Sequence, residues 1–334
     1  MQSLGVLKLP EWKGRFPGVL SALTIAIAAT FLSEHYGGPQ FLYALLFGMA
    51  FNYIPPDGIT GPGIDFAARA VLRFGVALLG ARITLGQISG LGGFAVLMVI
   101  GGVIATILFG TWLGRLLGRS STEGLLTGGS VAICGASAAL AISAVLPKDE
   151  ASQRLTLLTV VGVTTLSTLS MVIYPAIAKA LGLDPIGAGI FLGGTIHDVA
   201  QVVGAGFMIS PEAGDTATVV KLVRVAMLVP VVLVLSVVFR RSSRDSSGAR
   251  PPVLPGFLVG FVVLVGVNSL GLIPAKVSEG LSDISRWCLA TAIAALGVKT
   301  SLKQLAEVGW RPVALMVGET VFLALLIIGG LLVS

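Results

Sequence analysis

The stretch GGTIHDVAQVV at residues 193–203 decides how this chain is interpreted, because it places polar side chains in the middle of a long apolar run. The polar side chains are His197, Asp198 and Gln201. An ionisable group inside a membrane is costly and usually faces a cavity or a partner, which marks a functional site. A neutral His197 that forms a structural hydrogen bond, with Asp198 capping a half-helix, is the alternative interpretation.

The composition around this stretch is that of a membrane protein. Of the 334 residues, 55% are hydrophobic and 11% are charged, against roughly 45–50% and about 25% in soluble domains. The 22 basic and 16 acidic side chains are too few to cover so much apolar surface in water. The net charge of +6 sits in short loops, which is typical of membrane orientation signals and argues against a nucleic-acid partner. We therefore predict an all-α polytopic membrane protein.

Eleven segments are apolar enough to be membrane candidates, given that a spanning helix needs about 20 mostly apolar residues. They cover residues 17–35, 39–54, 66–83, 91–114, 123–146, 155–180, 186–209, 217–239, 254–272, 282–298 and 311–333. No soluble domain separates them. We expect a single integral membrane domain over residues 1–334, with a flexible basic cytoplasmic loop at 240–255.

The basic residues predict the orientation of the chain. Arg15, with Lys8 and Lys13, precedes the first segment, and Arg115 and Arg119 follow the fourth. Four crossings separate the two groups, so both face the same side. Positive charge gathers in cytoplasmic loops, whereas the acidic stretch at 210–215 belongs outside. The N-terminus is therefore expected to be cytoplasmic.

Internal similarity predicts inverted repeats. LGARITLGQ at 79–87 resembles LGVKTSLKQ at 296–304, and Asn52 and Asn268 occupy matching positions in earlier segments. The repeat-like halves cover approximately residues 39–146 and 186–333. Inverted repeats with helices interrupted at the midplane are the architecture of secondary transporters.

A second glycine-rich stretch, GGSVAICGASA at 128–138, resembles the first. Unwound backbone at membrane depth is tolerated where it is buried in protein or lines a cavity, and half-helix N-termini there favour an anion. Close packing of small residues is the alternative. We favour broken or re-entrant segments over two plain helices. The two stretches supply these candidate substrate-binding residues: Gly128, Gly129, Ser130, Cys134, Gly135, Ser137, Gly194, Thr195, His197, Asp198 and Gln201.

Deep charged residues add two more candidates, Arg73 and Arg224. Either could pair with Asp198 or Glu319, or could complement an anion. Lys221 lies nearer a segment end and is expected to extend its ammonium group toward water. The excess of deep bases over deep acids favours an anionic substrate.

Catalysis is not expected. Two histidines, His35 and His197, and two cysteines, Cys134 and Cys288, give neither metal-ligand spacing nor a disulfide framework. No hydrolase or phosphate-cradling motif is present, so neither an intramembrane enzyme nor a cofactor is predicted.

The stretches at 128–138 and 193–203 together resemble the YeiH-type family of bacterial inner-membrane proteins, to which sulfate export is assigned. That family is grouped with the cation:proton antiporter/anion transporter superfamily. The resemblance implies an elevator-type core that moves against a scaffold, commonly as a homodimer, in the bacterial inner membrane. It points to these two stretches as the site, although His197-Asp198 stands where we associate His-Glu with the family.

These observations predict a secondary active transporter of a small anion, such as sulfate, a sulfonate or a carboxylate, that works by alternating access. The coupling ion, proton or sodium, is left open. The alternative is a cation/proton antiporter with Asp198 as the carrier. Apart from substrate, coupling ion, lipid and a second copy of the chain, no partner is expected.

Overall fold

The computed structural model describes residues 11–37, 39–55, 58–86, 91–147, 150–239, 256–300 and 310–333. Within these ranges the chain is helical and contains no strand. The predicted basic loop at 240–255 and Lys8 lie outside them. The chain divides into two compact units, Met1–Leu79 with Pro274–Thr300 and Gly80–Ile273 with Ser301–Ser334.

The first unit consists of two long helices, α1 (Glu11–Tyr36) and α15 (Ala275–Lys299), with shorter helices packed against them. Its shorter elements are α2 (Gln40–Ala50), α3 (Gly61–Phe66), the π-helical turn η1 (Ala67–Val71) and α4 (Leu72–Leu79). Helix α15 packs against α2 and α4. Gly48 and Gly297 permit this approach, since a Cβ atom on Gly297 would lie 2.8 Å from the Cα of Gly48.

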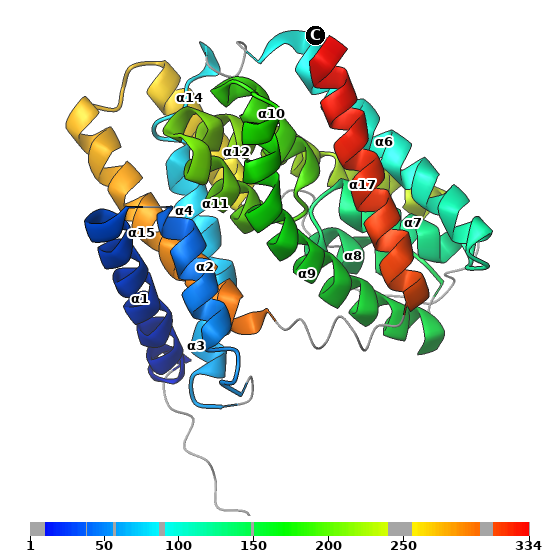
Figure 1. Ribbon diagram of the computed structural model, residues 1–334, viewed down its shortest axis with the longest axis horizontal. Coiled ribbons are helices and arrows are strands. Elements are labelled where there is room, and N and C mark those ends of the chain that lie inside the picture. Colours follow the sequence, from blue (N-terminus) through cyan, green and yellow to red (C-terminus); the bar gives the residue numbers. More distant parts are fainter. Residues whose placement is uncertain are drawn as a thin grey trace, which may run out of the picture. The chain divides into compact units, whose positions relative to one another are not determined.

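The second unit contains both stretches singled out above. Its elements are α6 (Gly92–Leu116), α7 (Ser121–Ala132), α8 (Ala136–Ser143), α9 (Glu150–Ala180), α10 (Pro185–Thr195), α11 (Val199–Ile209), α12 (Pro211–Ala226), α13 (Leu228–Val238), α14 (Gly256–Ser269) and α17 (Trp310–Val333). Helix α12 packs against α10 and α11, while α6 packs against α7 and α17 (Figure 1).

Each of the eleven predicted segments falls on at least one helix. In the described part of the chain, six helices are long and apolar enough to cross a membrane: Gly14–Tyr36, Gly92–Leu116, Arg154–Ala180, Pro211–Val238, Ala275–Lys299 and Trp310–Val333. Four further apolar helices are shorter. The all-helical membrane class is thus confirmed, whereas the count of eleven crossings and the elevator motion stay predictions.

The asparagines at matching repeat positions make corresponding contacts. The amide nitrogen of Asn52 donates to the carbonyl of Val298 at 2.8 Å, and that of Asn268 donates to the carbonyl of Ile83 at 3.2 Å. In each unit the asparagine of one predicted repeat therefore binds the Leu-Gly motif region of the other. This exchange accords with the predicted repeats and gives both asparagines a structural role.

Helices α6 and α7 are held together by glycines. A Cβ atom on Gly124 would lie 2.7 Å from the carbonyl carbon of Gly110, and one on Gly128 would lie 3.0 Å from the carbonyl oxygen of Thr106. Such close backbone approach is what small residues provide in membrane bundles. Packing therefore accounts for Gly128, which the sequence placed in the substrate site.

This packing predicts the effect of adding one methyl group. Gly124→Ala should destabilise the protein by about 1–3 kcal/mol, since the new atom meets main chain that cannot yield. Gly101→Ala on α6 is the matched control, because a Cβ atom there has no neighbour within 4 Å. Thermal unfolding of the two variants in detergent measures the difference. An equal midpoint for both would contradict the proposed close packing.

Candidate functional site

The first glycine-rich stretch is a helix broken inside the protein. Helix α7 begins at a favourable cap, where the Ser120 hydroxyl accepts a hydrogen bond from the Glu123 amide at 3.1 Å. It ends at Ala132, and α8 starts at Ala136. Between them Gly135 adopts φ +63°, a conformation that favours glycine. The glycine therefore sets the position of the break.

The second stretch is broken in the same manner. Helix α10 begins after Asp184, whose carboxylate accepts from the Gly187 amide at 2.9 Å, and it ends at Thr195. Helix α11 begins after Asp198, whose Oδ1 accepts from the Ala200 amide at 3.2 Å. The interpretation of Asp198 as the cap of a half-helix is confirmed.

The two breaks meet in space. A Cβ atom on Gly135 would lie 3.6 Å from the Cβ of His197. Four helix ends therefore come together within the second unit, two of them exposing carbonyl groups and two of them amide groups. An α-helix leaves its terminal backbone groups without partners inside the helix, so each end needs another source of hydrogen bonds.

Two basic side chains of α12 satisfy the carbonyl ends. The Lys221 ammonium donates to the carbonyls of Ile133 at 2.7 Å and Ile196 at 2.9 Å, one from each break. The Arg224 guanidinium donates to four carbonyls at 2.7–3.1 Å: Val131, Ala132, Gly193 and Ile196. One helix thereby clamps both breaks.

Electrostatics explains why cations occupy these positions. The C-terminal end of a helix carries a partial negative charge, and here the ends of α7 and α10 converge on Lys221 and Arg224. Both side chains are almost completely buried, with 0% and 1% exposed. The expectation that Lys221 extends toward water is wrong. Arg224 binds main-chain carbonyls and forms no ion pair with a carboxylate among the described residues.

The central polar side chains bind neighbouring helices. The Nε2 atom of His197 lies 3.0 Å from the Thr320 hydroxyl of α17. The Gln201 amide nitrogen donates weakly to the Thr168 hydroxyl of α9 at 3.4 Å, and its Oε1 has no hydrogen-bond partner among the described residues. The Ser167 hydroxyl accepts from the Asp198 amide at 2.9 Å. Helices α9 and α17 therefore hold the second break in place.

The N-termini of α8 and α11, which lie at the two breaks, differ in their capping. Asp198 caps α11, whereas α8 has no side-chain cap. Ser137, in the first turn of α8, is exposed, and Asp198 is partly exposed. Lys221 and Arg224 outnumber Asp198 as charged groups at the breaks, so the site carries a positive excess next to an uncapped helix N-terminus. That combination suits an anion.

The remaining predicted site residues take other positions. Ser130 is buried and bonds to its own helix at the Leu126 carbonyl, and Thr195 does the same at Phe191. Gly129 and Gly194 face the side chains of Ile142 and Ile327, and Cys134 is buried within the first break. Arg73 is exposed and belongs to the first unit, whereas both breaks belong to the second.

Sequence reasoning included Arg224 among the site residues but missed Lys221 and the hydroxyl side chains that support the breaks. Lys221 lies three residues before Arg224, so both occupy one face of α12, and this spacing was the available signal. No sequence signal pointed to Ser167, Thr168 or Thr320, because hydroxyl side chains are common in membrane helices and frequently bond to their own backbone.

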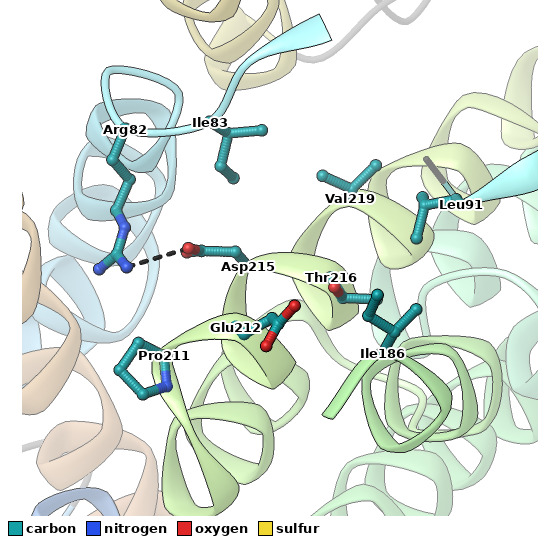
Figure 2. A pocket seen from close by; sticks show the side chains of 9 residues that line it. All are labelled: Arg82, Ile83, Leu91, Ile186, Pro211, Glu212, Asp215, Thr216 and Val219. Carbon is teal, nitrogen blue, oxygen red and sulfur yellow. Dashed lines mark ion pairs between the residues drawn. The ribbon is translucent and has the colours of Figure 1, made fainter. Parts of the chain in front are cut away.

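A cavity of about 420 Å³ lies elsewhere in the second unit, at the start of α12. Figure 2 shows Arg82 reaching Asp215, and the ion pair measures 3.0 Å. Glu212 and the apolar side chains of Ile186 and Val219 also line the cavity. None of the predicted site residues lines it.

Comparison with known proteins identifies relatives over nearly the whole chain. The family model described as Conserved hypothetical protein 698 matches residues 17–316. UPF0324 membrane protein CT0845 of Chlorobaculum tepidum is 59% identical, covering 94% of this chain and 88% of that protein. UPF0324 membrane protein TauZ of Paracoccus denitrificans is 57% identical, covering 95% and 94%. These matches confirm the membrane-protein family indicated by the two motifs.

Among solved structures, the sodium proton antiporter MjNhaP1 from Methanocaldococcus jannaschii aligns with 93% of this chain and 100% of that chain, with 14% identity and a TM-score of 0.31. A score this low is not evidence of a shared mechanism.

The hydrogen bonds from Arg224 of α12 to both breaks predict a marked loss of stability when this side chain is removed. Arg224→Leu should remove four hydrogen bonds and leave three carbonyls without this donor, since Ile196 also accepts from Lys221. Hydrogen bonds from a charged group contribute about 1.5–3 kcal/mol each. Arg224→Lys should lie between this variant and the wild type, because an ammonium cannot reproduce the planar fork. Arg286→Leu is the control, since that side chain is 56% exposed. Thermal midpoints in detergent test the order, and equal midpoints for Arg224→Leu and Arg286→Leu would contradict it.

Proposed function

The chain belongs to the family described as Conserved hypothetical protein 698, and from that premise we propose that it is a secondary active transporter of a small anion. The observation that carries the proposal is the meeting of two helix breaks around buried Lys221 and Arg224, beside the uncapped start of α8. The transport cycle is alternating access at this site.

The charge balance at the breaks favours an anion over a cation. The partial charges at two helix C-termini amount to roughly half an elementary charge each, which offsets only part of the two full charges on Lys221 and Arg224. The Asp198 carboxylate offsets about one further charge, but it lies at the N-terminus of α11, and the N-termini of α8 and α11 each add roughly half a positive charge. The sum is positive. The first amide groups of α8, together with the exposed Ser137 hydroxyl, supply donors of the type that an oxyanion accepts.

The substrate class in this proposal is sulfate, a sulfonate or a carboxylate, each of which presents oxygen acceptors to main-chain amides. The two predicted repeats form the framework around the breaks. The protein lies in the bacterial inner membrane as a homodimer, with its N-terminus in the cytoplasm and the basic loop at 240–255 on the same side.

A cation/proton antiporter is the second candidate. In its favour, Asp198 places a partly exposed carboxylate at the breaks, and no other carboxylate lies within the two breaks in the described part of the chain. In that mechanism Asp198 carries the ion, and the basic residues serve structure alone.

Ser137 allows a direct test of the anion site. Ser137→Asp places a carboxylate at a helix N-terminus, where it is electrostatically favourable to the fold but occupies the proposed anion position. Exchange of sulfate, methanesulfonate or succinate in proteoliposomes should fall at least about tenfold, equivalent to about 1.4 kcal/mol. Ser137→Asn, of the same size and neutral, should retain exchange within about twofold, a difference of less than 0.5 kcal/mol by the same relation.

Two outcomes would count against the proposal. Absence of exchange of all three anions by the wild type would remove the anion function, whereas unchanged exchange in Ser137→Asp would remove the anion site at the start of α8. Sodium-driven or pH-driven cation exchange without any anion, lost in Asp198→Asn, would establish the second candidate instead.

A further inference from the structure

Helix α17 contacts both broken helices through two adjacent residues. The Thr127 hydroxyl of α7 donates to Oε1 of Glu319 at 2.7 Å. The next residue, Thr320, is the hydroxyl that lies 3.0 Å from Nε2 of His197 at the other break. A change at either break therefore acts on the same turn of α17.

Glu319 is an unusual residue in this position. It is 0% exposed, and its Oε2 has no hydrogen-bond partner among the described residues. No basic side chain in that part of the chain forms an ion pair with it. An isolated carboxylate in such surroundings would be very costly, whereas a carboxylic acid would not. The geometry therefore favours the protonated group.

Few charged or titratable groups on the neighbouring helices lie near Glu319. Glu123 of α7 is the charged group close enough to act on its carboxyl. On α6, the residue beside Glu319 is Gly110. Helices α9 and α10 also pack against α17, but there Gly162 and Gly194 lie beside Met316 and Ile327, not beside Glu319. His197 at the second break is the titratable group reached through Thr320.

A short path of polar groups connects Glu319 to the surface. The single hydroxyl proton of Thr127 is shared between Oε1 of Glu319 and the main-chain carbonyl of Glu123, which lies 3.1 Å away one turn earlier. The Glu123 carboxylate pairs with Arg119 at 2.6 Å, and the Arg119 side chain is 32% exposed. Thr127, Glu123 and Arg119 therefore lie one after another between the buried carboxyl and the loop between α6 and α7, with Thr127 bonded to the main chain of Glu123 and Arg119 to its carboxylate.

We propose that Glu319 is the binding site for a coupling proton, which it exchanges with one side of the membrane through the α6–α7 end and with the other side once the breaks have rearranged. The inference rests on the proposed function and adds the coupling ion to it. In the balanced step the Glu319 carboxylate binds one proton to give the acid, and the acid releases that proton when the breaks rearrange around the anion. Thr127 and Thr320 are positioning residues that link this event to both breaks.

Infrared spectroscopy tests proton binding independently of transport. The wild type at neutral pH should show the C=O band of a protonated carboxylic acid, and Glu319→Gln should remove it. Glu279→Gln is the matched control, since Glu279 is exposed on α15 of the first unit. Thr127→Val keeps the acid but removes its hydrogen-bond donor, so the band should shift to higher frequency. A wild type without the band, or a band unchanged by Glu319→Gln and Thr127→Val alike, would overturn the proposal.

Transport in proteoliposomes tests coupling. With sulfate or methanesulfonate as the labelled anion, the wild type should accumulate the anion when a pH gradient is imposed, and a trapped pH indicator should report proton movement. Glu319→Gln should lose this accumulation but keep anion exchange at equilibrium, where no net proton moves. Accumulation equal to that of the wild type would refute the coupling role. Failure of the wild type to exchange any anion would instead refute the proposed function, and the infrared result would still stand.

Discussion

The second unit depends on one constraint, which is that a helix broken within an apolar interior must have its exposed backbone groups satisfied. Lys221 and Arg224 meet that requirement for both breaks at once, through six hydrogen bonds to five carbonyls. Their own burial would be costly elsewhere, but the negative ends of two helices compensate it. Breaks and cations therefore stabilise one another.

The same constraint distinguishes the helix ends whose backbone groups have side-chain partners from the one helix end at the breaks that has no side-chain cap. The carbonyl ends are sealed by side chains with at most 1% exposed, and α11 is capped by its own Asp198. The start of α8 has no such cap and carries the exposed Ser137. A polar group that the fold leaves unsatisfied is available to a ligand, so the start of α8 directs the proposal toward an anion. The buried Glu319 is the second place of this kind.

Glycine serves two separate purposes in this protein, and the sequence did not distinguish them. Gly135 is required by its positive φ at the first break. Gly124 and Gly128 are required because α7 lies against the backbone of α6. Both purposes occur at α7, which explains why the glycine-rich stretch is compatible both with a broken segment and with small-residue packing.

The sequence by itself determined the membrane class, the family and the position of both breaks, because hydropathy, glycine content and helix caps act through neighbouring residues. Tertiary structure alone decided the partners of the charged groups. It placed Arg73 in the first unit, turned Lys221 inward to carbonyls 88 and 25 residues away, and brought Thr320 to His197 across 123 residues. Such pairings follow from which helix faces meet, and helix packing is set by the whole fold and not by local pattern.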